Sequence, residues 1–218
     1  MVVQLNSCFY SNLSDSEKSQ LGLIPASYGL SDFRHNVMDA LVNRFGSANV
    51  VQGNKSVKIQ FNSTGVVPAD VVVCIEYRHY SALRVLYTGM GFLTNAGQEL
   101  IINYPKLHYE NGTKKSDRTS GAYKKTVRMF KNANRYFRER YQARTVPSYL
   151  IECSLYNIKD SLFSFQLRDR FYKIASLLAE DDVSNFVSQN GIGTLWGNRP
   201  DQFEASLLRK FACNMQKL

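Results

Sequence analysis

Asp70 lies directly before Val71 to Ile75, a continuous apolar run rich in β-branched residues. Such a run is typical of a strand buried on both faces. A carboxylate at the mouth of a buried strand is costly to leave unpaired, so it usually has a charged partner or a metal ion. Asp70 is therefore a candidate metal ligand. The alternative is an aspartate that merely ends a turn.

A second group of candidates is basic. Lys124, Arg128 and Lys131 recur at steps of four and three, which places them on one face of a helix. Like charges on one helical face repel each other unless an anion binds there. A nucleoside triphosphate would be such an anion, and a solvated basic surface is the alternative.

The element that positions Asp70 is a predicted hairpin. Lys55 to Phe61 alternates polar and apolar side chains, the pattern of a half-buried strand. The turn-forming residues Asn62 to Gly65 separate it from the Val71 to Ile75 strand, so the two strands are expected to pair. Arg78, His79 and Tyr80 are expected just beyond this second strand.

Further elements of the first half follow from composition and spacing. Met1 to Leu5 is typical of a strand end, and residues 6–30 are expected to form a surface loop with one short helical turn. A helix is predicted from Ser31, as N-cap, to Gly46, with an apolar stripe that packs on the sheet. Leu83 to Ile102 is typical of a second hairpin that turns at residues 94–97.

The second half is predicted to be mostly helical. An extended loop from Asn103 should lead into the basic helix, which ends near Tyr141. Helices are then expected after Pro147, over Arg168 to Ala179 and over Pro200 to Met215. The chain is therefore expected to be α+β, with a sheet lobe over 1–102, a helical lobe over 103–218 and a groove between them.

The composition indicates which kinds of binding partner and which cellular compartment to expect. The 218 residues include 27 Lys and Arg against 18 Asp and Glu, and a net charge of +9 favours a polyanionic partner. The four cysteines lack metal-ligand spacing, which is typical of reduced core thiols in a cytoplasmic protein. No apolar run reaches membrane-spanning length, so no membrane partner is expected.

Several segments together resemble the cGAS/DncV-like nucleotidyltransferases of bacterial anti-phage signalling, within the polymerase β-like superfamily. In chain order they are GNKSVKIQF, ADVVVCIEYRHY, IINYPKLHYENGTKKSDRTSGAYKKTVRMFK and PSYLIECSLYN. The resemblance covers nearly the whole chain. It implies enzymes that link nucleoside triphosphates into cyclic di- or trinucleotides, which then activate a separate effector protein.

The resemblance also implies roles for individual residues. Nucleotidyl transfer uses two divalent ions, Mg²⁺ or Mn²⁺, about 4 Å apart on carboxylate oxygens. The family holds them with an Asp-x-Asp pair, after a Gly-Ser motif, and a third aspartate that Asp70 matches. Arg128 and Lys131 match residues that face the donor triphosphate, and Lys124 extends this set. Ser148 and Tyr149 match a Ser-Tyr step at the donor phosphates and base.

The chain departs from the family pattern at its start. Neither the Gly-Ser motif nor the Asp-x-Asp pair occurs in the sequence, and Met1 falls where the residue after the second aspartate would be. We therefore expect a nucleotidyltransferase that lacks its first segment. With one of three carboxylates present, two metal ions cannot be held, so this 218-residue chain is expected to be inactive or nearly so.

Three other functions remain open at this point. A catalytically dead regulator would bind a triphosphate or cyclic nucleotide without turnover. A nucleic-acid-binding module would use the positive charge and the Tyr and Phe residues of 123–141 for backbone contact and stacking. A template-independent RNA nucleotidyltransferase is the nearest enzymatic alternative.

Overall fold

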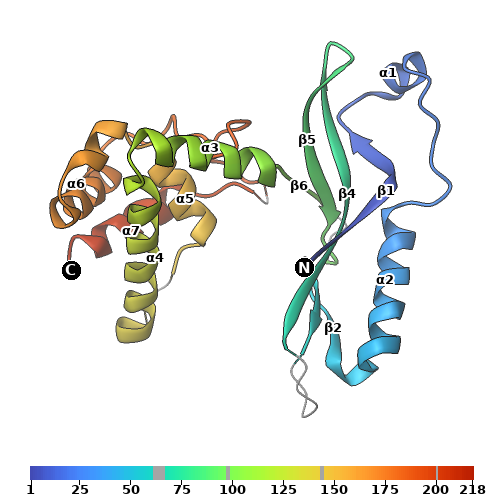
Figure 1. Ribbon diagram of the computed structural model, residues 1–218, viewed down its shortest axis with the longest axis horizontal. Helices are drawn as coiled ribbons and strands as arrows, with labels where there is room; N and C mark the ends of the chain where they lie inside the picture. The colour runs from blue at the N-terminus through green and yellow to red at the C-terminus, as the bar shows by residue number, and fades with distance from the viewer. Residues whose placement is uncertain (61–66, 97–98, 143–144, 200) are drawn as a thin grey trace. The chain divides into compact units, whose positions relative to one another are not determined.

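A computed structural model describes residues 1–60, 67–96, 99–142, 145–199 and 201–218. The chain divides into two compact units, Met1–Tyr104 and Pro105–Leu218. Strands dominate the first unit and helices the second (Figure 1). The predicted α+β class is therefore confirmed.

The first unit is built on a six-stranded sheet with the order β2-β3-β4-β5-β6, in which β1 also pairs with β4. The strand β4 (Ala69–Ser81) is the longest described strand. It pairs with β1, β3 and β5. The predicted pairing of the two strands around residues 62–65 is confirmed by the antiparallel β3–β4 ladder, although the turn itself lies outside the described residues. The other strands are β1 (Val2–Ser11), β2 (Val50–Gln52), β3 (Val57–Ile59), β5 (Arg84–Leu93) and β6 (Leu100–Asn103).

Strand β1 is longer than the sequence predicted. Residues 6–11, expected in a loop, continue the strand, because Phe9 to Ser11 pair in parallel with Glu76 to Arg78 after an irregularity that follows Leu5. Residues 6–11 include Cys8, Phe9 and Tyr10 but show no alternating strand period across this irregularity, so the long-range pairing decides the structure. The predicted short helix does form, as α1 (Asp15–Gln20).

The second strand of the central hairpin also runs further than expected. Arg78, His79 and Tyr80 were expected beyond the strand, but they lie within β4 and pair with β5. The reversal is a tight turn at Ala82 and Leu83, both with positive φ. The predicted hairpin of β5 and β6 is confirmed, except that Gly97 of its turn lies outside the described residues.

The helix α2 (Leu30–Phe45) lies along one face of the sheet (Figure 1). Its stripe of Phe33, Val37, Leu41 and Phe45 packs on β4 and its neighbours, as predicted. The predicted N-cap Ser31 is wrong, because the helix begins at Leu30 and Ser31 lies within its first turn. Gly29 is the N-cap, and the Asp32 carboxylate accepts a hydrogen bond from the Gly29 backbone N–H at 2.8 Å. The helix ends at Gly46, which has a φ of 82°.

The second unit contains five α-helices within its described residues: α3 (Pro105–Arg118), α4 (Ala122–Tyr141), α5 (Ser148–Tyr156), α6 (Leu167–Glu180) and α7 (Ala205–Met215). A short 3-10 helix spans Asp160–Ser164. The basic helix is α4, and its buried side includes Val127, Phe130, Ala133 and Phe137 as predicted. The last helix begins at Ala205, so residues 201–204, predicted as helical, are not.

One element of this unit contradicts the sequence analysis. The predicted extended loop after Asn103 is the helix α3 from Pro105 onward. Proline suits the first position of a helix, where its missing N–H has no helical partner. Gly112 weakens the helical pattern in the sequence, but here it is buried against the Gln189 side chain, where a Cβ would overlap the amide.

The four cysteines are free thiols, and Cys74 and Cys153 are buried. Within the described part of the chain, no helix is both long and apolar enough to cross a membrane.

Candidate functional site

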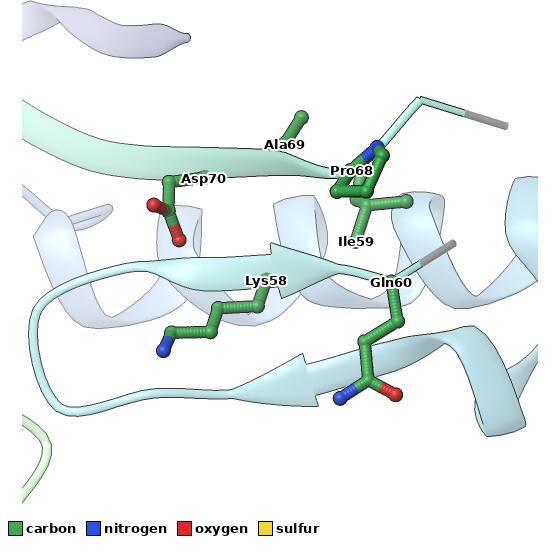
Figure 2. A pocket seen from close by; sticks show the side chains of 6 residues that line it. All are labelled: Lys58, Ile59, Gln60, Pro68, Ala69 and Asp70. Atoms are coloured by element: carbon green, nitrogen blue, oxygen red, sulfur yellow. The ribbon is translucent and has the colours of Figure 1, made fainter. Parts of the chain in front are cut away.

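Asp70 is the second residue of β4 and is exposed, so it lies at the start of the strand rather than within its buried part. It lies opposite Lys58 of β3, and its carboxylate Oδ1 accepts a hydrogen bond from the Ser56 hydroxyl at 3.1 Å. Asp70 and Lys58 line a small hollow of about 350 Å³ with Ile59, Gln60, Pro68 and Ala69 (Figure 2). Among the described residues no cluster of three or more His, Cys, Asp or Glu could hold a metal ion.

Asp70 and the core residues beneath α2 lie on opposite faces of β4. Val71, Val73 and Ile75 are buried in the clusters that include α2 residues. Because side chains alternate along a strand, Asp70 belongs to the opposite face, together with Cys74 and Glu76. Buried strand residues thus fix the backbone at Asp70 and leave its carboxylate accessible.

The three basic candidates of α4 have different surroundings. Arg128 is exposed, and no ion pair holds its guanidinium within the described ranges. The Lys124 ammonium donates to the Thr113 hydroxyl at 3.3 Å and lies 5.7 Å from the centre of the Tyr109 ring. Lys131 forms an ion pair with Glu152 of α5. The structure therefore relieves part of the repulsion that the sequence analysis assigned to this face.

Glu152 connects three helices at this place. Its Oε1 accepts from the Lys131 ammonium on α4, and its Oε2 lies 2.7 Å from the His108 Nε2 on α3. Burial raises the pKa of Glu152, but the hydrogen bonds from His108 and Lys131 and the charge of Lys131 outweigh burial and hold this pKa below its usual value. Glu152 is therefore ionised at neutral pH.

Ser148 and Tyr149 form the first turn of α5. Ser148 is exposed at the helix N-terminus, where the helix dipole favours an anion. The Tyr149 ring stacks on the His108 ring, with centroids 5.3 Å apart and planes 23° apart. Burial raises the pKa of the Tyr149 hydroxyl, which is therefore neutral at physiological pH.

The structure thus joins some of the predicted residues through groups that the sequence analysis did not name. Lys131 and Tyr149 belong to one network because Glu152 bonds both Lys131 and His108, and His108 stacks on Tyr149. Asp70 belongs to the other unit. His108 and Glu152 are 44 residues apart, so no local spacing could have identified them as a pair.

Comparisons with known proteins identify relatives over the entire chain. The family of the cGAS/DncV-like nucleotidyltransferase C-terminal helical domain matches residues 110–218. The cyclic UMP-AMP synthase of Rhodothermus marinus is 40% identical over 223 residues, which cover 100% of this chain and 76% of the relative. The cyclic nucleotide synthase CdnE01 of Staphylococcus haemolyticus is 35% identical, over 100% of this chain and 77% of the relative.

A solved structure agrees with these relatives. The structure of the Rhodothermus marinus CdnE c-UMP-AMP synthase with Apcpp and Upnpp superimposes with a TM-score of 0.88 at 39% identity, covering 98% of this chain and 74% of that one. The likeness extends across both units, in the order that the sequence resemblance implied. The chain belongs to the cGAS/DncV-like nucleotidyltransferases.

Proposed function

We propose that this chain binds a nucleoside triphosphate as the donor in the synthesis of a cyclic di- or trinucleotide, a second messenger of anti-phage defence that acts on a separate effector in the cytoplasm. The observation that carries this proposal is the likeness, over 98% of this chain and 74% of the other, to a synthase whose solved structure contains Apcpp and Upnpp. The relatives named above are both cyclic nucleotide synthases.

In this proposal the phosphate-binding residues come from α4 and α5. Arg128 has no competing ion pair in the described part of the chain, so its guanidinium is free to bond phosphate oxygens. Lys131 and Lys124 add positive charge on the same face. Ser148 contributes its hydroxyl and the N-terminal end of α5. The base would stack on Tyr149, whose ring also lies beside His108 and Phe203.

Asp70 is the proposed metal ligand of the sheet unit. Its exposed carboxylate fits Mg²⁺ or Mn²⁺, since hard cations prefer carboxylate oxygens and the Oδ1 is held by the Ser56 hydroxyl. Divalent ions supply charge neutralisation at the triphosphate and activate the attacking hydroxyl. A single carboxylate does not suffice for two ions, so we propose that the 218-residue chain binds nucleotide with little or no turnover.

A binding experiment tests this proposal. The chain is titrated with Apcpp and magnesium in a calorimeter, together with the variants R128M and R140M. Arg140 is a matched control, because it is an exposed arginine of the same helix that lies off the Lys124 face. We expect saturable binding that R128M weakens about ten-fold, as the loss of one charge-assisted hydrogen bond predicts. R140M should bind like the unchanged chain.

Two outcomes would contradict the proposal. Equal losses in R128M and R140M would indicate a general attraction of anions to a basic helix. The absence of binding would remove the donor site altogether. Separately, magnesium-dependent consumption of nucleoside triphosphates by the purified chain would show that the proposed lack of turnover is wrong.

A further inference from the structure

Glu152 is the one carboxylate in the network that joins α3, α4 and α5. Its two oxygens have different partners, the Lys131 ammonium on one side and the His108 imidazole on the other. The exposed fractions of the three side chains are 26% for Glu152, 33% for Lys131 and 19% for His108. The contact is therefore half-buried, where a hydrogen-bonded ion pair is stronger than on an open surface.

The backbones that carry this network are fixed by separate hydrogen bonds. The Tyr123 hydroxyl lies 3.1 Å from the Glu152 carbonyl oxygen and 2.5 Å from the Gln189 Oε1, and its single proton is shared between these two acceptors. The Gln189 side-chain amide in turn donates to the His108 carbonyl oxygen at 2.8 Å. These hydrogen bonds hold the backbones of α3, α4 and α5 together without involving the Glu152 carboxylate.

The bonding of His108 determines its tautomer. An ionised carboxylate only accepts hydrogen bonds, so His108 donates its Nε2–H to Glu152. The other ring nitrogen, Nδ1, is buried and has no hydrogen-bond partner in the described residues. The orientation of the ring thus depends on Glu152 and on the stack with Tyr149. A change at Glu152 should therefore reach Tyr149 through His108.

We propose that Glu152 is a positioning residue of the donor-nucleotide site. One carboxylate oxygen places the Lys131 ammonium for the phosphates, and the other holds the His108 ring that supports Tyr149 for the base. This inference rests on the proposed function. It adds that one side chain couples the phosphate half of the site to the base half.

A competing role for Glu152 predicts the opposite change in nucleotide affinity. If Glu152 only competed with the triphosphate for Lys131, removing its negative charge would make the site more positive and tighten nucleotide binding. If Glu152 positions its partners, its removal releases a long cationic side chain and a ring, and binding weakens. The sign of the change therefore distinguishes the two roles.

The experiment compares E152Q, K131M and the double variant K131M/E152Q in binding Apcpp and inorganic tripolyphosphate, which has no base. E180Q is the matched control, since Glu180 is an exposed glutamate of α6 whose carboxylate accepts from Gln216. We expect E152Q to weaken Apcpp binding at least about five-fold and E180Q to leave it unchanged. The double variant K131M/E152Q should bind tripolyphosphate with the same affinity as K131M, because Glu152 acts on phosphate through Lys131.

The base half is tested by H108F, which retains a ring beside Tyr149 but loses the hydrogen bond to Glu152. It should weaken Apcpp more than tripolyphosphate. Nitrogen NMR of the His108 ring should show the Nε2–H tautomer in the unchanged chain and a mixture in E152Q. Thermal unfolding of each variant checks its folding. If E152Q does not fold, equal weakening of both ligands in H108F, or an Nδ1–H tautomer in the unchanged chain, would contradict the positioning role.

The experiment distinguishes a failure of the proposed function from a failure of the positioning role of Glu152. If the unchanged chain does not bind Apcpp, the proposed function is wrong. If the chain binds Apcpp and E152Q binds it equally well or more tightly, the positioning role of Glu152 is wrong and the proposed function stands. Additive losses for tripolyphosphate in K131M/E152Q would also contradict the positioning role.

Discussion

The Met1 ammonium donates a hydrogen bond to the Asp70 carbonyl oxygen at 2.7 Å, and the Val72 N–H donates to the Met1 carbonyl oxygen at 2.9 Å. Met1 is thus level with Val71 at the start of the parallel β1–β4 ladder. In the same register Val2 lies opposite Val72 and Val3 opposite Val73. A residue placed before Met1 in the same strand would lie opposite Asp70 and point to the same face.

This register predicts where added carboxylates would complete a metal site. A chain extended at its N-terminus by residues that end in Asp-Val-Asp, directly before Met1, should place both new carboxylates on the face of Asp70. We expect it to bind Mn²⁺ at least about ten-fold more tightly than the 218-residue chain, because three carboxylates replace one. Electron paramagnetic resonance of free Mn²⁺ measures this change.

A shifted extension is the control. Ending the extension in Asp-Val-Asp-Val moves both carboxylates to the opposite face, since a shift of one residue reverses every side chain. This chain should gain no affinity for Mn²⁺, and D70N should abolish the gain of the in-register chain. Equal gains in both registers would contradict the assignment of Asp70 as a metal ligand.

Tyr149 should discriminate between ligands with and without a base. Replacing Tyr149 with Ala removes a stacking surface that contributes about 1–3 kcal/mol per base. We therefore expect Y149A to weaken Apcpp binding about ten-fold and tripolyphosphate binding hardly at all. Y149F, which retains the ring on His108, should bind both ligands nearly as well as the unchanged chain. Equal losses for both ligands in Y149A would instead indicate that the helix start is disrupted.

Lys115 should stabilise the helical unit through a buried charge. Its ammonium donates to the Ile158 carbonyl oxygen and to the Asp160 carboxylate, both at 2.7 Å, and only 4% of its side chain is exposed. K115M should lower the free energy of unfolding by about 2–3 kcal/mol, less than for a fully buried pair, because Asp160 is partly exposed. K114M, at an exposed position of α3, should change it by less than about 0.5 kcal/mol.

The same cluster predicts a pH dependence. Partial burial raises the pKa of Asp160, but Lys115 and Arg118 outweigh burial and hold this pKa below its usual value. A carboxyl with a lowered pKa in the folded state stabilises the fold above its unfolded pKa of about 4, and this contribution is lost as the pH falls through the folded pKa. Trp196, the only tryptophan, reports unfolding of this unit. K115M should lose less stability than the unchanged chain when the pH falls from about 6 to about 3.

Gly112 should be required by close packing rather than by backbone conformation. Glycine to alanine inside a helix usually stabilises it by up to about 1 kcal/mol. Here a Cβ would overlap the Gln189 amide, which is held by bonds to His108 and Tyr123. We expect G112A to lower the free energy of unfolding by about 1–3 kcal/mol. In a Q189A background the same change should no longer destabilise, and a persistent loss there would contradict the packing account.

The sequence predicted the elements whose signals are local. The apolar stripes of α2 and α4, the central hairpin and the helix after Pro147 all have periods or turn residues that are visible in a short window. Residues 6–11 and the helix α3 were missed for different reasons. The first forms a strand only because it pairs with β4, and the second contains a glycine that close packing requires.

The candidate site shows the same division between local and long-range information. The family resemblance named Lys131 and Tyr149, and their spacing on helices is visible in the sequence. Glu152 and His108, which connect them, could not be found in this way, because the contact joins residues far apart in the chain. Ion pairs of this kind depend on helix packing and have no signature in a single sequence.

The most direct test of the account is a crystal structure of the 218-residue chain with Apcpp and Mn²⁺. The account predicts phosphate oxygens within hydrogen-bond distance of Arg128 and Lys131, the adenine against the Tyr149 ring, and Lys131 still bonded to Glu152. A nucleotide bound elsewhere on the chain, or phosphates that contact neither Arg128 nor Lys131, would contradict it.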